Sequence, residues 1–134
     1  MTDRELMLHA VAARKLSYSP YSGFKVGAAL LGKSGKVYTG CNVENAAYTP
    51  TNCAERTAVF KAVSEGEREF LAIAIVGGKD EEPADFCAPC GVCRQVLAEF
   101  CDGGFRILLG TPDNVQVYTM SEVLPYSFGK SDLR

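Results

Sequence analysis

The chain has 134 residues, of which 14 are Lys or Arg and 16 are Asp or Glu, so its formal net charge at pH 7 is -2. Apolar residues make up 47%, which is ordinary for a globular protein and excludes disordered and collagen-like chains. The lack of excess positive charge argues against a nucleic-acid-binding protein, and no apolar stretch is long enough to span a membrane. Because the first ten residues also lack a signal-peptide core, we expect one cytoplasmic domain over residues 1–134.

Hydrophobic periodicity and turn residues divide the chain into helices and strands. The first helix is predicted to follow Thr2, whose spacing to Glu5 matches a capping box. Segment 32–36 is typical of a hairpin turn, and the apolar run 70–76 is typical of a central strand buried on both faces. The predicted elements are a helix over 3–16, strands over 24–31 and 37–41, a loop over 42–52, a helix over 53–65 capped by Asn52, a strand over 70–76, a helix from about 90 to before 103, strands over 105–109 and 115–118, and a short tail.

The order of these elements indicates the fold class. A strand over 70–76, a following helix and a strand over 105–109 have the lengths of a right-handed parallel crossover. The strands over 24–31 and 37–41 are joined too closely for a crossover and should form an antiparallel hairpin. Together these connections predict an α/β protein with one mixed sheet covered by helices.

The six cysteines point to metal binding or catalysis rather than to a disulfide framework, because the chain is expected to be cytoplasmic. Cys90 and Cys93 are three residues apart at a predicted helix start, which places both sulfur atoms on one face where they can bind one metal ion. A redox-active pair is the less favoured alternative, because such a pair normally opens the first helix of a thioredoxin-like unit. An iron-sulfur cluster is excluded, because Leu97 stands where the fourth cysteine would follow.

Cys53 opens another predicted helix, so two helix N-termini can converge on one metal ion. Three cysteine ligands would leave a fourth tetrahedral position for water, which is typical of a catalytic zinc site. Glu55, two residues further, is near enough to exchange protons with that water. Two alternatives remain open: a closed structural site with Cys87 as the fourth ligand, or an ordinary core thiol at Cys53 beside a first-turn acid at Glu55. Cys41 and Cys101 are predicted to be buried, inert thiols.

Five segments together resemble the zinc nucleoside deaminases. Cys53-Ala54-Glu55 and Pro89-Cys90-x-x-Cys93 match the zinc-binding motif, with cysteine where related branches use histidine. The match continues through FKVGAAL (24–30), NVENAAY (42–48) and LPYSF (124–128), as in the small homotetrameric cytidine deaminases with three cysteine ligands. The resemblance implies an α/β/α sandwich around a five-stranded mixed sheet. It also implies one Zn²⁺ ion per chain and hydrolysis of cytidine and deoxycytidine to uridine or deoxyuridine and ammonia, in pyrimidine salvage.

The same resemblance implies roles for individual residues. Zn²⁺ is held by Cys53, Cys90 and Cys93 and activates a water molecule that attacks C4 of the base. Glu55 then transfers the protons. The implied substrate-binding residues are Asn42 and Glu44 at the ribose hydroxyls, Phe24 and the backbone of Ala54 at the base, Tyr48 in the pocket wall, and Phe128 from a neighbouring subunit of a homotetramer with shared active sites.

Three thiolates around one Zn²⁺ ion leave a net charge of about -1, which weakens the metal as a Lewis acid. In the branch with three cysteines, an arginine at the position of Arg56 is implied to donate hydrogen bonds to the thiolates and to offset that charge. Arg94, directly after Cys93, could also support the thiolates, but a surface cation is the favoured interpretation. Among the alternatives, the segment NVENAAY favours a nucleoside over a blasticidin-type substrate, and a zinc-stabilised interaction module without activity remains open.

Overall fold

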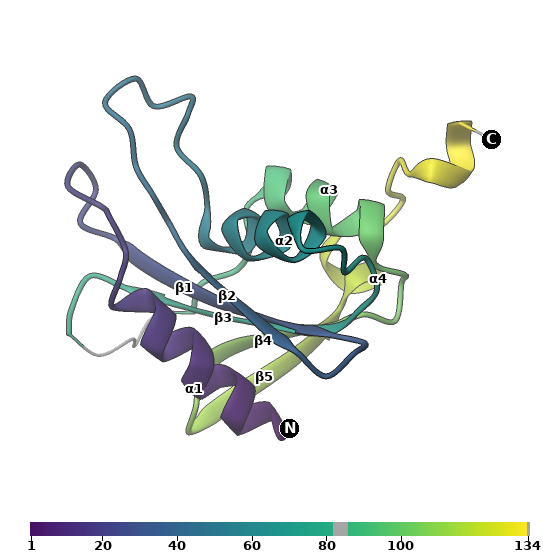
Figure 1. The fold of residues 1–134 in the computed structure, drawn as a ribbon, viewed down its shortest axis with the longest axis horizontal. Coiled ribbons are helices and arrows are strands. Elements are labelled where there is room, and N and C mark those ends of the chain that lie inside the picture. Colours follow the sequence, from purple (N-terminus) through teal and green to yellow (C-terminus); the bar gives the residue numbers. More distant parts are fainter. Residues whose placement is uncertain (82–85, 134) are drawn as a thin grey trace.

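A five-stranded mixed sheet lies between two layers of helices in the computed structural model, which describes residues 1–81 and 86–133 (Figure 1). The β3 and β4 strands are parallel, and every other neighbouring pair in the order β2-β1-β3-β4-β5 is antiparallel. This confirms the expected α/β/α sandwich and the parallel crossover. The strands are β1 (Lys25–Gly32), β2 (Val37–Cys41), β3 (Phe70–Gly78), β4 (Arg106–Thr111) and β5 (Asn114–Thr119).

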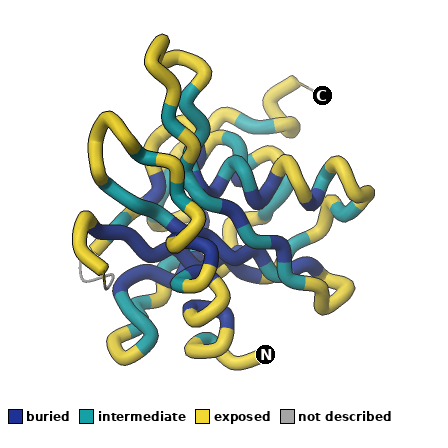
Figure 2. The backbone as a smooth tube through the Cα atoms, turned by 60° about the vertical axis from the view of Figure 1, so that its left-hand side comes forward, coloured by how far each residue is buried: buried dark blue, intermediate teal, exposed yellow. Residues whose placement is uncertain are grey.

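Helices cover both faces of the sheet. The helix α1 (Asp3–Arg14) lies on one face, and α2 (Ala54–Ser64) and α3 (Gly91–Phe100) lie on the other (Figure 1). Each face has its own apolar core, and Figure 2 shows the buried backbone concentrated in the strands between them. Thr2 caps α1 as predicted, because its hydroxyl accepts a hydrogen bond from the Glu5 backbone N–H at 3.1 Å. In the described part of the chain, every helix is too short or too polar to cross a bilayer.

The α2 helix packs closely on β2 because Gly40 has no side chain. A Cβ atom at this position would lie 2.5 Å from the Ala54 carbonyl oxygen and 2.6 Å from the Ala58 backbone nitrogen. Both are backbone atoms of α2, so no side-chain rotation could make room for it. Gly40 therefore allows the N-terminus of α2, which carries Cys53 and Glu55, to sit close to the sheet.

One predicted helix cap is wrong. The α2 helix begins after Cys53, whose side chain makes no capping hydrogen bond, and Asn52 lies one residue too early to cap it. The backbone of Asn52 pairs with Val43, and its side-chain amide donates to Thr57 Oγ1 at 3.1 Å. Pairing across the 42–52 loop thus overrides the local capping preference of asparagine.

The tail is more ordered than predicted. A short helix, α4 (Met120–Val123), and a 3₁₀ helix, η1 (Lys130–Leu133), follow β5. Thr119 and Glu122 form a capping box at the start of α4, with reciprocal side-chain to backbone hydrogen bonds. The spacing of these two residues was the signal in the sequence that would have predicted this helix.

Candidate active site

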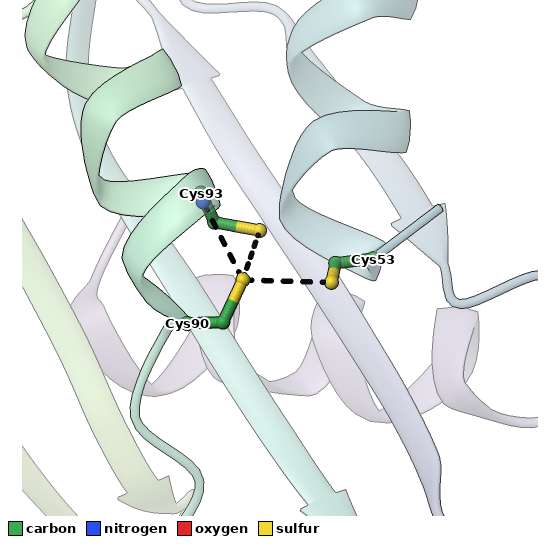
Figure 3. Close-up of side chains that lie close together, drawn as sticks. All are labelled: Cys53, Cys90 and Cys93. Carbon is green, nitrogen blue, oxygen red and sulfur yellow. Dashed lines mark hydrogen bonds between the residues drawn. The ribbon is translucent and has the colours of Figure 1, made fainter. Parts of the chain in front are cut away.

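Three cysteine side chains meet where the N-termini of α2 and α3 come together (Figure 3). Cys53 is the N-cap residue of α2, Cys90 is the N-cap residue of α3, and Cys93 lies in the first turn of α3. Cys90 Sγ lies 3.7 Å from Cys53 Sγ and 3.3 Å from Cys93 Sγ, and all three sulfurs lie within 4.8 Å of one another. Sulfur atoms around a tetrahedral Zn²⁺ ion lie about 3.8 Å apart, because Zn–S bonds are about 2.3 Å long. The cluster therefore fits a Zn²⁺ ion.

The other cysteines lie outside this cluster. Cys87 lines the adjoining cavity but is not part of the three-sulfur group among the described residues, so this geometry does not support a closed four-cysteine site. Cys41 and Cys101 are half-buried rather than fully buried as predicted. Burial raises the pKa of Cys101 to about 12 and also raises the pKa of Cys41, which keeps both in the inert thiol form at neutral pH.

Hydrogen bonds within the cluster favour a thiolate at Cys53. The hydrogen bond with the Cys93 thiol is the main cause that lowers the pKa of Cys53 to about 5, and Arg56 contributes further. The pKa of Cys93 is raised in turn, first by this hydrogen bond and then by burial. Arg56 Nη2 lies 3.4 Å from Cys53 Sγ, and in the described structure its buried Nε has no hydrogen-bond acceptor. A guanidinium with a spare donor thus lies beside the sulfurs, where it can offset thiolate charge.

Glu55 lies in the first turn of α2 and is only 4% exposed. Burial raises the pKa of this carboxyl to about 7, because water no longer stabilises its charged form. A carboxyl with such a pKa can both hold and release a proton near neutral pH. Its side chain lines the same cavity as Cys53 and Cys90.

A cavity of about 280 Å³ opens beside the cluster. Its size is close to the lower end of the range for small-molecule sites, about 300–1,000 Å³. The walls come from four separate parts of the chain: the approach to β1, the 42–52 loop, the start of α2 and the segment before α3. They bring four residues with an implied substrate-binding role next to the cysteines and Glu55: Phe24, Asn42, Glu44 and Ala54.

Asn42 and Glu44, at the start of the 42–52 loop, both face this cavity, as their alternate spacing predicts for extended backbone. Asn42 is fixed by the protein itself: its Nδ2 donates to the Phe24 carbonyl at 2.8 Å and its Oδ1 accepts from the Val26 N–H at 2.9 Å. Glu44 Oε1 accepts hydrogen bonds from the backbone N–H groups of Tyr21 at 2.9 Å and Ser22 at 3.1 Å. A further hydrogen bond from the Ser22 hydroxyl is the main cause that lowers the pKa of Glu44, so this carboxylate stays charged.

A family of known proteins combines these features. The model of the cytidine and deoxycytidylate deaminase zinc-binding region matches residues 1–108, which include the three cysteines, Glu55 and the cavity. The chain belongs to this deaminase family. The resemblance carried by the sequence motifs is thereby confirmed, as is the expectation of an enzyme.

Individual deaminases resemble the chain over nearly its whole length. The cytidine deaminase of Sporosarcina psychrophila is 48% identical over 134 residues, which cover 99% of this chain and 96% of that protein. The cytidine deaminase of Halalkalibacterium halodurans is 49% identical over 133 residues, which cover 98% of each. The crystal structure of cytidine deaminase from Burkholderia pseudomallei superimposes with a TM-score of 0.87 at 47% identity, covering 96% of this chain and 100% of that one.

Two residues implied by the deaminase resemblance lie outside the cavity at the cysteines. Tyr48 lines an adjoining cavity of about 400 Å³ and packs edge-on against Tyr21, with ring centroids 6.4 Å apart. The two cavities share Glu44 in their walls. Phe128 is 60% exposed and is not among the described residues that line either cavity. Within one chain, the described structure therefore does not bring Phe128 to the cavity at the cysteines.

Two further residues, one in the cavity walls and one directly after Cys93, were missed or misjudged from the sequence. Ser22 lines both cavities, bonds Glu44 and accepts a hydrogen bond from the Phe24 N–H at 3.0 Å; the only signal was its place in a Ser- and Gly-containing turn before the first strand. Arg94 was predicted to be a surface cation, and this is wrong. It is half-buried and donates to the carbonyls of Pro89 and Val123, because α4, which ends at Val123, packs against α3.

Proposed function

We propose that this chain is a zinc-dependent enzyme that hydrolyses cytidine and deoxycytidine to uridine and deoxyuridine, with release of ammonia, in the salvage of pyrimidine nucleosides. The observation that carries the proposal is the position of the buried carboxyl of Glu55 in one cavity with two of the three clustered cysteines. Membership of the deaminase family and the names of the similar proteins support cytidine as a substrate.

Cys53, Cys90 and Cys93 would hold one Zn²⁺ ion per chain and leave a fourth tetrahedral position open. When bound, the ion supplies Lewis acidity that makes water a nucleophile at neutral pH. Arg56 offsets the negative charge of the sulfur ligands, so that this acidity is retained. Glu55 lies at the same helix N-terminus and interacts with the Cys93 side chain through a hydrogen bond, so it would stand beside the ion without being one of the three sulfur ligands.

Glu55 carries the protons of the proposed reaction. Its carboxylate accepts a proton from the water that adds to C4 of the base and donates that proton to ring N3. It then accepts the proton of the new hydroxyl group at C4 and donates it to the departing amine. The C4–N bond breaks, and uridine and ammonia are the products. The burial of Glu55 serves both directions of transfer, because its pKa lies near neutral pH.

The remaining cavity residues orient the nucleoside in this proposal. Asn42 and Glu44 bind the ribose hydroxyls, since the charged Glu44 accepts from a hydroxyl and the second N–H of the Asn42 amide remains as a donor. Phe24 packs on the base, and the backbone of Ala54 pairs with its polar edge. Tyr48 lines the pocket, and Phe128 enters the cavity of a neighbouring chain. In this proposal the enzyme is a homotetramer with shared sites and acts in the cytoplasm.

The test is the conversion of cytidine absorbance to uracil absorbance by the purified, zinc-containing chain. Glu55→Gln should keep its fold and zinc while losing at least about 10²- to 10⁴-fold in turnover, the usual contribution of general acid-base catalysis. The matched control is Glu99→Gln on the exposed face of α3, which should keep wild-type turnover. A zinc-containing wild-type chain that leaves cytidine unchanged would instead be an interaction module, and near-normal turnover of Glu55→Gln would rule out its role.

A further inference from the structure

The C-terminal segment stands away from the body of the molecule. In Figure 1 it is drawn in yellow and projects beyond α3, away from the sheet. Tyr126 is fully exposed and Phe128 is 60% exposed, so neither aromatic side chain is buried by its own chain. Tyr126 also has a φ of 54°, which is uncommon for a bulky residue. Val123 and Leu124 pack partly against the core, whereas residues 125–128 are exposed, so polar contacts are needed to hold these exposed residues in a fixed shape.

Two consecutive side chains of α3 make such contacts. Arg94 Nη1 donates to the Val123 carbonyl at 2.7 Å, and Gln95 Nε2 donates to the Phe128 carbonyl at 2.8 Å. Residues 123–128 are therefore bound to α3 at both ends. Arg94 Nε also donates to the Pro89 carbonyl at 2.8 Å, directly before the first cysteine of α3. The helix that carries two of the clustered cysteines thus also holds the tail.

We infer that Arg94 and Gln95 are positioning residues, which fix the C-terminal segment so that Phe128 is presented to the cavity of a neighbouring chain; this rests on the proposed function, in which Phe128 contacts substrate there. The geometry suits the role, because the backbone of Phe128 is bound while its ring stays exposed. Arg94 contacts both the Pro89 carbonyl beside Cys90 and the Val123 carbonyl of the tail. Gln95 is exposed on α3, so changing its amide leaves the core intact.

The first test uses Gln95→Glu, which keeps the size of the side chain but replaces the donor with a carboxylate that repels the Phe128 carbonyl. We expect the KM for cytidine to rise about 3- to 10-fold with kcat within about 2-fold, as for loss of one hydrogen bond that orders a binding residue. Zinc content should stay unchanged. Glu99→Gln, one turn further along α3, is the control and should keep the wild-type KM. A wild-type KM in Gln95→Glu would overturn the inference.

The second test does not depend on activity. The chain contains no tryptophan, so Phe128→Trp introduces a single indole at the position in question. Adding Gln95→Glu should lower the fluorescence anisotropy of this indole in the intact oligomer, whereas adding Glu99→Gln should not. Equal anisotropy in all three proteins would show that Gln95 does not hold the tail.

The third test asks which chain's site the tail serves. Chains with Glu55→Gln are co-expressed with chains with Gln95→Glu, so that mixed oligomers, confirmed by mass, contain sites that join an intact Glu55 to an intact neighbouring tail. These oligomers should show a kinetic component with the wild-type KM. A KM that stays raised would place the effect of Gln95 within its own chain. Phe128→Ala distinguishes failure of the shared site from failure of the positioning role. If Phe128→Ala leaves KM unchanged, the shared site itself is wrong. If Phe128→Ala raises KM but Gln95→Glu does not, only the positioning role fails.

Discussion

Replacing Gly40 by alanine tests whether close packing of α2 on the sheet sets the geometry of the active site. The new Cβ would lie 2.5 Å from the Ala54 carbonyl oxygen and 2.6 Å from the Ala58 nitrogen, whereas ordinary contacts begin at 3.4 Å. The helix must therefore retreat by up to about 0.9 Å, because both clashes are with its backbone. The part that moves is the N-terminus, which carries Cys53 and Glu55.

Overpacking of this kind costs about 1–3 kcal/mol of unfolding free energy. A displacement of about 1 Å in a catalytic group lowers the rate about 10²-fold, so we expect Gly40→Ala to lose about this factor in rate while the protein stays folded. Urea unfolding, zinc content and the initial rate of cytidine deamination measure the three effects. The control is Gly104→Ala, whose Cβ would meet Asp102 Oδ1 at an ordinary 3.5 Å. Wild-type stability and rate in Gly40→Ala would refute the view that this contact sets the site.

Three further predictions concern charge and metal binding. Arg56→Gln should lower kcat, with less effect on unfolding, because the thiolate charge is no longer offset; a wild-type rate and zinc affinity would contradict this. Cys87→Ala should keep zinc by elemental analysis whereas Cys90→Ala should lose it, and loss from both would indicate four ligands. Hydrogen bonds from Ser34 lower the pKa of Glu67 in the folded protein. The charged Glu67 therefore stabilises the fold fully above the ordinary glutamate pKa, and this stabilisation is lost as pH falls through the pKa of Glu67 in the folded state. Glu67→Gln should therefore be less stable than wild type at pH 7 in urea unfolding, and the difference should shrink towards pH 3; a constant difference would exclude this linkage.

The amino-acid sequence by itself determined the features that depend on near neighbours. The capping box at Thr2, the buried strand over 70–76 and the placement of Cys90 and Cys93 on one helix face all follow from spacings of a few residues. The order of helices and strands then predicted one mixed sheet with a hairpin and a parallel crossover, and the structure supplied the order of its strands. The five motifs spread along the chain were jointly specific enough to indicate the family by resemblance.

Only the tertiary structure decided which distant groups meet. Cys53 and Cys90 are 37 positions apart, and their sulfurs approach to 3.7 Å because the N-termini of α2 and α3 come together on one face of the sheet. The role of Arg94 was misjudged for the same reason, since its partner Val123 lies 29 positions away. Such contacts form when apolar faces pack and buried polar groups take the partners that packing leaves within reach. Local propensity contains no information about those partners, so the tail and the cavity walls emerged only from the folded chain.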